Sequence, residues 1–509
     1  MSMLDFTKIM RPYFRSGAVC RQVAEDEISS VQQSVLKELV RKGAETEYGR
    51  KYGFGSIRSY EEFAAAVPVV EYPGLRPYVM RMIAGEKNVL WHGRIRRYAQ
   101  SSGTSDGKSK FIPITPEGLR KNHYKGAASV VARYLANNPH SRIFSGRGFI
   151  LGGSFANTLG IRGKVKAGDL SAHLIEHIPE IINFFRTPSK KTALMENWTE
   201  KLPALVRESI RKNVTNISGV PSWFLTVLKD VLKETGKQSI HQVWPDLEVF
   251  FHGGISFDPY RKEYDRILDS SKMNYVETYN ASEGFFAVQD RPTPELGMEL
   301  LLDCGVFYEF IPLGSLNEKH PAALTADKVK PGEIYALCIT SLNGLWRYLI
   351  GDTVRVTTTD PLRIKIAGRT HSFINAFGEE VMVYNADRAI TAAADRTSLS
   401  VLNYTAAPVY AEDKKRGRHQ WFVEFRTPPE SIERFTDELD AALQQENSDY
   451  QAKRSGGIFL DKPEVISVPH GTFDRLLEMT GKLGGQRKVP RLSNDRTVAD
   501  RIMKIINLN

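Results

Sequence analysis

The stretch Ser101-Ser-Gly-Thr-Ser-Asp-Gly-Lys-Ser-Lys110 lies between two segments, 94–100 and 110–114, whose residues are typical of β-strands. Its two glycines allow backbone N–H groups to converge on an anion. Four serines and a threonine supply hydroxyl donors, and two lysines supply positive charge. These are the groups that hold the phosphates of a nucleotide. A plain polar hairpin loop is the alternative, but this composition between two strands favours a phosphate-binding loop.

Two other motifs share these residues. The loop resembles the phosphate loop of kinase-type proteins, but only three residues separate Gly103 from Gly107, and that motif must open a helix rather than a strand. Gly103-Thr-Ser-Asp-Gly107 also matches the nucleophile elbow of serine hydrolases, which requires a strand–turn–helix context. The proline and the β-type residues of 110–114 oppose that context, so we favour neither motif.

The charge balance agrees with a nucleotide ligand. The 509 residues include 69 Lys and Arg against 59 Asp and Glu, a formal net charge of +10. The basic residues are scattered along the chain, so we expect no nucleic-acid partner. A polyanionic nucleotide ligand would explain the excess positive charge as well as a nucleic-acid partner would.

The three cysteines, Cys20, Cys304 and Cys338, stand far apart in the sequence and form no metal-binding pair. We expect buried free thiols in a reducing compartment. The first 17 residues lack the apolar core of a signal peptide. No apolar stretch reaches the roughly 18 residues that span a bilayer, so the sequence predicts a cytoplasmic protein without a membrane partner.

The segments that follow alternate between helices and short apolar strands, which is typical of an α/β fold. Thr115 is the expected N-cap of a helix that begins at Pro116. We expect a helix over 222–234 and strands over 247–251, 275–279 and 334–339. A composition shift near residue 370 predicts a large N-terminal domain of mixed sheets with flanking helices (1–370) and a smaller α+β domain (371–509). The small domain should contain a strand over 420–425 and an amphipathic helix with Ile432, Phe435, Leu439 and Leu443 on one face.

The loop resembles the first nucleotide motif of the plant hormone-conjugating acyl acid amido synthetases, the Gretchen Hagen family, and of their bacterial relatives. Four further stretches resemble motifs of that family in the family's order: Thr46–Phe54, Tyr279-Asn-Ala-Ser-Glu283, Trp346-Arg-Tyr-Leu-Ile-Gly-Asp352 and Gly484–Arg491. The third has Trp346 where the family has tyrosine. Because the matches cover nearly the whole chain, we identify it as a bacterial member of the family within the adenylate-forming superfamily.

The resemblance implies an ATP-dependent ligase. Such an enzyme activates a carboxylic acid as an acyl-adenylate, releases pyrophosphate and transfers the acyl group to an amine, here expected to be an amino acid. The resemblance also implies Mg²⁺, because the first step brings several negative charges together. An acyl-CoA ligase of the same superfamily and a nucleotide-binding protein without turnover stay open as alternatives. The acid, the amine and the oligomeric state stay undetermined; the apolar segments 149–155 and 223–227 could line an acyl pocket or belong to the core.

The resemblance assigns roles to residues of this chain. Glu283 is the expected Mg²⁺ ligand, and Lys488 in the small, mobile domain is the expected catalytic residue that stabilises charge on the α-phosphate during adenylation. Tyr279 could stack on adenine, and Asp352 could accept hydrogen bonds from the ribose. Arg369 would meet the nucleotide near a hinge whose pivot is uncertain, because His371 stands where the superfamily often has Asp or Lys. The full set of predicted ATP-binding residues is Ser101, Ser102, Gly103, Thr104, Ser105, Lys110, Gly254, Tyr279, Ser282, Glu283, Asp352 and Arg369.

Overall fold

A computed structural model of the chain forms two compact units. The large unit comprises Met1–Ile350 and Arg355–Lys365, and the small unit comprises Gly351–Val354 and Ile366–Asn509. The predicted boundary at residue 370 stays a prediction. The structure describes residues 5–101, 110–254, 257–316, 318, 320–370, 373–374, 379, 381–409, 417–447, 450–451, 454, 460–479, 489–493 and 495–507.

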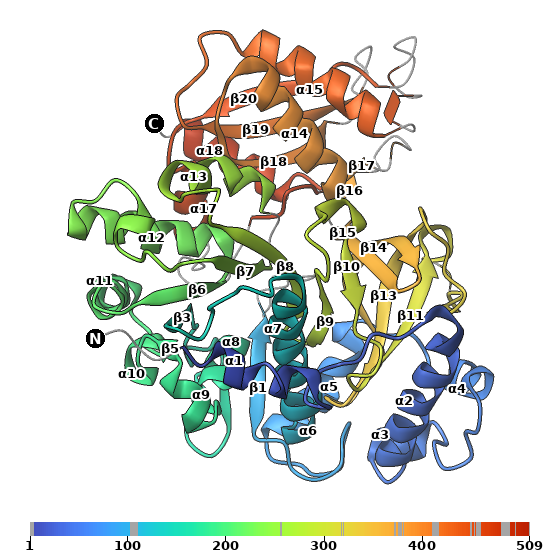
Figure 1. Cartoon of the computed structure of the whole chain (residues 1–509). Helices are drawn as coiled ribbons and strands as arrows, with labels where there is room; N and C mark the ends of the chain where they lie inside the picture. Colours follow the sequence, from blue (N-terminus) through green and yellow to red (C-terminus); the bar gives the residue numbers. More distant parts are fainter. Residues whose placement is uncertain are drawn as a thin grey trace. The chain divides into compact units, whose positions relative to one another are not determined.

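The main sheet of the large unit has twelve strands within the described residues (Figure 1). Neighbouring strands β5, β3, β6, β7 and β8 run parallel, and β9 pairs antiparallel with β8. The strands in spatial order are β12 (Leu324–Thr325), β11 (Val306–Pro312), β13 (Ile334–Ser341), β14 (Leu345–Thr359), β15 (Leu362–Arg369), β10 (Met298–Leu300), β9 (Gly284–Val288), β8 (Asn274–Ala281), β7 (Val249–Gly253), β6 (Val214–Gly219), β3 (Arg147–Ile150) and β5 (Arg186–Thr187). The predicted mixed α/β fold is confirmed.

The parallel strands are buried on both faces, as their continuous apolar runs require. In β7, Phe250 packs with Phe224 of α12 (Pro221–Thr235), while its neighbours Val249 and Phe251 pack with Val130 of α7 (Lys125–Asn137) on the other face. Figure 1 shows α12 and α7 flanking this part of the sheet. The other helices of the large unit are α1 (Thr7–Met10), α2 (Ile28–Gly43), α3 (Glu47–Lys51), α4 (Tyr60–Ala66), α5 (Tyr72–Ile83), α6 (Pro116–Gly118), the π-helix η3 (Leu119–Tyr124), α8 (Leu170–Glu176), α9 (Glu180–Phe184), α10 (Lys190–Ala193), α11 (Trp198–Ser209) and α13 (Asp258–Ile267).

A second, three-stranded sheet carries the predicted phosphate loop. β1 (Arg97–Ser101) pairs antiparallel with β2 (Lys110–Pro113), so Ser101 and Lys110 are register partners at the base of the loop, and β4 (Lys166–Gly168) pairs with β1. The Thr115 hydroxyl accepts the Gly118 N–H at 2.8 Å and caps α6, as predicted. The segment after the loop is therefore a strand, which agrees with neither the kinase-type loop nor the hydrolase elbow. Residues 102–109 lie outside the described residues.

The small unit is an α+β domain, as expected. Its three-stranded sheet comprises β18 (Val401–Val409), β19 (Arg418–Phe425) and β20 (Glu464–Val468). Trp421 and Val423 of β19 pack with α14 (Val383–Thr397) and α15 (Ile432–Glu446), whereas Phe422 packs with α17 (Thr472–Met479) and α18 (Thr497–Asn507). Alternate residues of one strand thus serve two cores.

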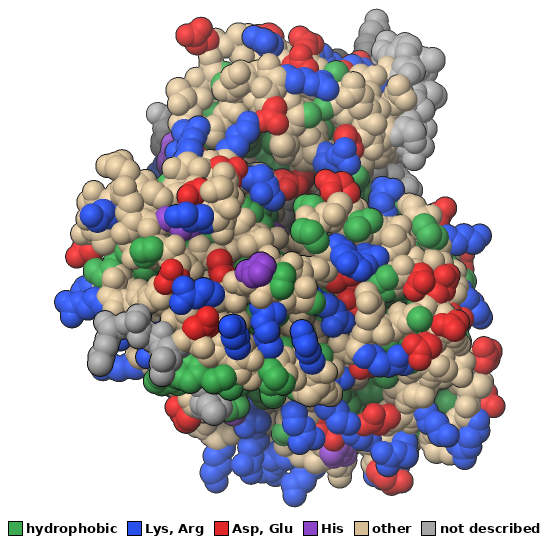
Figure 2. Space-filling view, viewed as in Figure 1, with side chains coloured by type: hydrophobic (Ala, Val, Ile, Leu, Met, Phe, Trp, Pro, Cys, Tyr) green, Lys and Arg blue, Asp and Glu red, His purple; other side chains and the backbone are tan. Residues whose placement is uncertain are grey.

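The prediction of three free thiols was wrong for two of them. Cys20 and Cys304 form a disulfide with their Cα atoms 6.2 Å apart, and Cys338 is a buried free thiol. The two bonded cysteines are 284 residues apart in the sequence, so only the fold brings them together. Among the described residues, no helix has the length and apolar character needed to cross a membrane. Lys and Arg side chains are spread over the face in Figure 2, interspersed with Asp and Glu.

Candidate active site

Small residues follow the carboxyl ends of the neighbouring parallel strands. Gly152 and Gly153 follow β3, Gly219 ends β6, and Gly254 follows β7. A Cβ on Gly253 would lie 2.4 Å from the Thr278 carbonyl oxygen, and Gly254 has a φ of +80°, so both positions favour glycine. Ligands of open α/β sheets bind beyond the carboxyl ends of the strands. The predicted residues Gly254, Ser282 and Glu283 therefore share the edge of the sheet where a ligand is expected.

Glu283 is a buried carboxylate in the turn between β8 and β9. The Tyr348 hydroxyl donates to Glu283 Oε1 at 3.5 Å, and Lys110 Nζ donates to the Tyr348 hydroxyl at 3.3 Å. Ammonium, phenol and carboxylate thus form one row that begins at the base of the predicted phosphate loop. The structure brings two predicted residues, Lys110 and Glu283, to one place through a third residue that the sequence analysis did not assign to the site.

Arg347, the residue before Tyr348, makes its contacts away from this row. Arg347 has a left-handed φ of +42°. Its Nε and Nη2 donate to the fully buried Glu309 at 2.8–3.1 Å, and its Nη1 donates to the Ala64 and Val67 carbonyls, each at 2.8 Å. The arginine of the third motif is therefore a structural residue of the large unit. Strand alternation within that motif was the signal that could have assigned its tyrosine to the site.

Two buried asparagines hold the turn that carries Glu283. Asn122 of η3 accepts the Phe285 N–H at 2.7 Å and donates to the Phe285 carbonyl at 3.0 Å and the Cys304 carbonyl at 3.1 Å. Asn343 donates to the Glu283 carbonyl at 3.3 Å and accepts the Thr115 N–H at 3.1 Å. Neither residue lies in a recognisable motif, so the sequence analysis missed both.

Two further titratable groups lie on the same strands. His252 and Glu277 are register partners on β7 and β8. Burial lowers the pKa of His252 to about 3, so its ring, stacked on Phe257, is neutral. Burial and the charge of Asp258 raise the pKa of Glu277 to about 7. The β7–β8 pair therefore combines a neutral imidazole with a carboxyl group that titrates near neutral pH.

The remaining predicted residues have separate places. Tyr279 is buried on β8 with its ring centroid 5.0 Å from that of Phe286. Asp352 is buried in the small unit, where the Thr370 N–H donates to the Gly351 carbonyl, and Arg369 ends β15. The predicted residues that lie outside the described ones are Ser102, Gly103, Thr104, Ser105 and Lys488.

The donors present suit Mg²⁺ bound together with a nucleotide. That ion is commonly held by one or two carboxylates, with phosphate oxygens and water completing its octahedron. Glu283 would supply a buried hard oxygen ligand, and the Lys110 ammonium lies on the other side of the Tyr348 hydroxyl. Among the described residues, one group of side chains has the spacing of a metal site made by protein ligands alone, and it comprises Cys20, Asp303 and Cys304. Glu283 is not part of such a group, so it fits a metal ion that binds together with phosphates.

Sequence comparison agrees with this architecture. The GH3 family N-terminal domain matches residues 22–158 and 160–273, the GH3 family central domain matches 299–369, and the GH3 family C-terminal domain matches 384–497. The chain belongs to the GH3 family. The GH3 matches span both units. The N-terminal and central matches include the strands β1–β7 and β14, while β8 and the turn that carries Glu283 lie in the stretch 274–298 between these two matches.

The GH3 relatives are similar over almost their full length. A jasmonoyl–L-amino acid synthetase, JAR6 of Nicotiana attenuata, is 24% identical over 91% of this chain and 90% of its own. The indole-3-acetic acid-amido synthetase GH3.3 of Arabidopsis thaliana is 23% identical over 91% of this chain and 89% of its own.

Solved structures share the fold. The GH3.15 acyl acid amido synthetase in complex with 2,4-DB has a TM-score of 0.76 at 19% identity and covers 94% of each chain. A 2-hydroxyisobutyryl-CoA ligase in its postadenylation state has a TM-score of 0.55 at 15% identity, over 94% of this chain and 92% of the other. These likenesses confirm the predicted adenylate-forming fold.

Proposed function

We propose that this GH3 chain is an acyl acid amido synthetase that joins a small carboxylic acid to an amino acid at the expense of ATP. The row of Lys110, Tyr348 and Glu283 at the base of the phosphate loop carries the proposal. The predicted ATP-dependent ligase agrees with the family and with the names of the two relatives above, an amino acid synthetase and an amido synthetase. A bacterial origin and a cytoplasmic location belong to the same proposal.

In the first half-reaction, an oxygen of the substrate carboxylate attacks the α-phosphorus of ATP and pyrophosphate leaves. Lys110 would bind phosphate oxygens and stay oriented by the Tyr348 hydroxyl. Mg²⁺, when bound, would neutralise phosphate charge, and Glu283 would hold it. Buried groups of this kind are effective because water screens them little.

In the second half-reaction, the amine attacks the acyl carbon and AMP leaves. The remaining predicted residues take the roles that the family implies: Gly254 beside the adenine, Tyr279 against its ring, Asp352 on the ribose hydroxyls and Arg369 near the phosphate or ribose. Lys488 would stabilise the charge that develops on the α-phosphate. Rotation of the small domain would let one site serve both half-reactions.

An acyl-CoA ligase is the second candidate, because a CoA ligase shares the fold. The two candidates differ in what consumes the acyl-adenylate. In a single turnover, preformed acyl-adenylate should disappear when amino acids are added and persist when coenzyme A is added. The opposite result would assign the chain to the CoA ligases.

ATP–pyrophosphate exchange tests the first half-reaction. A panel of aryl and aliphatic acids should include at least one that stimulates exchange, and a panel without any such acid would contradict the proposal. Lys488→Ala should leave ATP binding nearly intact while adenylation collapses. Lys462→Ala is the matched control, because Lys462 is half-exposed and pairs with Asp437 on the surface of the small unit. An unchanged adenylation rate in Lys488→Ala would remove the role given to Lys488.

A further inference from the structure

The disulfide joins a segment that has little regular structure of its own to the main sheet. Residues 5–24, here called the N-terminal segment, contain the four-residue helix α1 and one short 3-10 turn, and residues 16–24 have no helix or strand. Cys20 lies near the end of this segment, and Cys304 lies in the connection between β10 and β11. Both side chains are fully buried.

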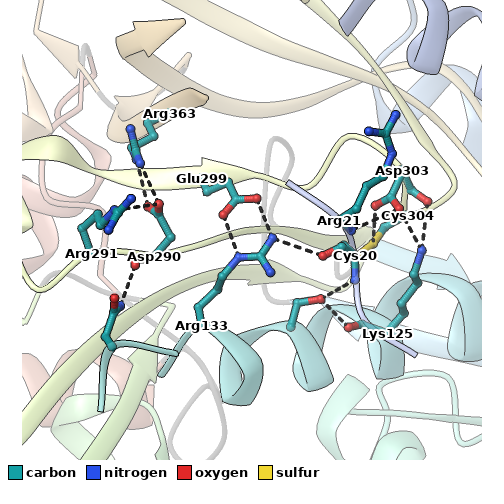
Figure 3. Close-up of polar contacts among 12 residues, drawn as sticks. Cys20, Arg21, Lys125, Arg133, Asp290, Arg291, Glu299, Asp303, Cys304 and Arg363 are labelled. Atoms are coloured by element: carbon teal, nitrogen blue, oxygen red, sulfur yellow. Dashed lines mark hydrogen bonds and ion pairs between the residues drawn. A yellow bond between two sulfur atoms is a disulfide. The ribbon is translucent and has the colours of Figure 1, made fainter. Parts of the chain in front are cut away.

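One face of the helical stretch 122–137 holds both partners of the disulfide. Ser129 accepts the Cys20 N–H at 2.8 Å, and Arg133 donates to the Cys20 carbonyl at 3.1 Å. Lys125 donates to Asp303 beside Cys304 at 3.0 Å, and Asn122 donates to the Cys304 carbonyl. These helix residues are three or four positions apart and so lie on one face. Figure 3 shows Lys125 and Arg133 pointing from this face toward Asp303 and Glu299.

Apart from the disulfide, the attachments of the N-terminal segment are mainly side-chain contacts. Arg11 donates to the Leu135, Asn138 and Pro139 carbonyls at 2.7–3.0 Å, at the carboxyl end of α7. The Phe6 N–H donates to the Phe144 carbonyl at 3.3 Å. The Phe14 ring also stacks on Phe144, and Val23 is buried, but residues 16–24 belong to no helix or strand. A segment without such regular pairing opens locally at a lower free energy than the strands of the sheet. Opening of this segment would expose Cys20 and then Cys304 without unfolding the sheet.

The surroundings of the pair suit thiol chemistry better than a metal ion. Donor atoms of Cys20, Asp303 and Cys304 lie within 4.8 Å of one another. The Lys125 ammonium already occupies Asp303 Oδ2, and its charge opposes a divalent cation at that place. Asp303 Oδ1 lies 3.7 Å from Cys304 Sγ, so it can accept a hydrogen bond from the Cys304 thiol once the disulfide is reduced. The Cα separation of 6.2 Å lies within the range of unstrained disulfides.

We propose that Cys20 and Cys304 are a reversible redox site that takes a small-molecule disulfide, such as oxidised glutathione, as its oxidant. When the N-terminal segment opens, the Cys20 thiolate attacks one sulfur of the oxidant, forms a mixed disulfide and releases the first glutathione thiolate. The Cys304 thiolate then attacks the Cys20 sulfur and releases the second. Two protein thiols are oxidised, one small disulfide is reduced to two thiols, and the two protons pass to the released thiolates.

Oxidation locks the N-terminal segment onto helix α7 and the β10–β11 connection. The disulfide also restrains the residues next to the β8–β9 turn, because Asn122 forms hydrogen bonds with both the Cys304 carbonyl and the backbone of Phe285. We therefore expect oxidation to slow tryptic cleavage at Arg15 and Arg21 by about tenfold, since cleavage requires local opening. Exchange of the Phe285 amide hydrogen should slow as well. Neither readout depends on the proposed enzymatic activity.

The test uses the full chain, reduced with dithiothreitol or oxidised with oxidised glutathione. Alkylation after denaturation should modify all three cysteines of the reduced chain, but only Cys338 of the oxidised chain, by intact mass. Cys20→Ser and Cys304→Ser should abolish the effect of oxidation on trypsin cleavage, and the control Cys338→Ser should keep it.

Three outcomes would overturn the proposal. One is a chain that still has three alkylatable thiols, or that carries glutathione on one cysteine, after oxidation. Another is a disulfide that dithiothreitol does not reduce in the folded chain, which would make it a permanent structural bond. The last is equal trypsin cleavage of the two forms. Comparison of the reduced and the oxidised unsubstituted chain decides between these outcomes even where a serine variant fails to fold.

Discussion

Replacing Arg347 by methionine should destabilise the large unit by about 3–5 kcal/mol, the usual cost of removing one partner of a buried ion pair. The substitution keeps most of the side-chain volume but removes three hydrogen bonds to Glu309 and two to backbone carbonyls. Glu309 is fully buried. Without Arg347, its carboxylate would stay buried with no positive charge beside it to offset the free-energy cost of removing it from water. Methionine has the same difficulty as arginine with the left-handed φ, so backbone strain contributes no difference.

The free energy of unfolding from urea titration measures this effect. Adding Glu309→Leu to the Arg347→Met variant should recover a large part of the loss, because no charge then stays buried. Arg81→Met is the control, since Arg81 forms exposed ion pairs with Glu47 and Glu86 and should change the urea midpoint little. A loss below about 1 kcal/mol in Arg347→Met, or a double variant less stable than the single one, would refute the assignment of this pair.

Substitutions at three further positions test the site and its support. Glu283→Gln should raise the Mg²⁺ concentration needed for adenylation by about tenfold while metal-free ATP binding, measured by calorimetry, stays unchanged; an unaltered Mg²⁺ dependence would exclude Glu283 as the ligand. Asn122→Leu should cost about 3 kcal/mol in urea unfolding, because it leaves buried backbone groups of Phe285 and Cys304 unpaired, and Asn122→Asp should also destabilise because it loses both donated bonds. Burial lowers the pKa of His123 to about 4. Between pH 6.5 and about 4 the unfolded chain therefore binds a proton that the folded chain does not, so the free energy of unfolding decreases as the pH is lowered. His123→Leu should flatten that fall by about 3 kcal/mol at pH 4, and a pH profile equal to that of the unsubstituted chain would show that His123 titrates normally.

Local patterns in the sequence predicted most of the secondary structure around the site. The strands on either side of the phosphate loop, the Thr115 cap and the helix over 222–234 all follow from neighbouring residues, and the structure has each of them within a few positions. Backbone preference, capping and apolar period act over a few residues, so a single sequence reveals them. Resemblance to a family added Glu283 and Lys110, because each belongs to a short motif.

Tertiary structure decided which of these residues meet. Tyr348 lies 65 positions from Glu283, Asn122 lies 163 from Phe285, and Cys20 lies 284 from Cys304. Arg347 and Tyr348 are adjacent, yet one enters a buried ion pair and the other reaches the candidate active site. Such contacts depend on how the sheet, η3 and the N-terminal segment pack, and packing is a property of the whole core rather than of any local pattern. Sequence alone therefore predicted a phosphate-binding loop between two strands and showed the motifs of a ligase family. Only the packed chain decided that a tyrosine links the lysine of that loop to the carboxylate, and that two distant cysteines form one bond.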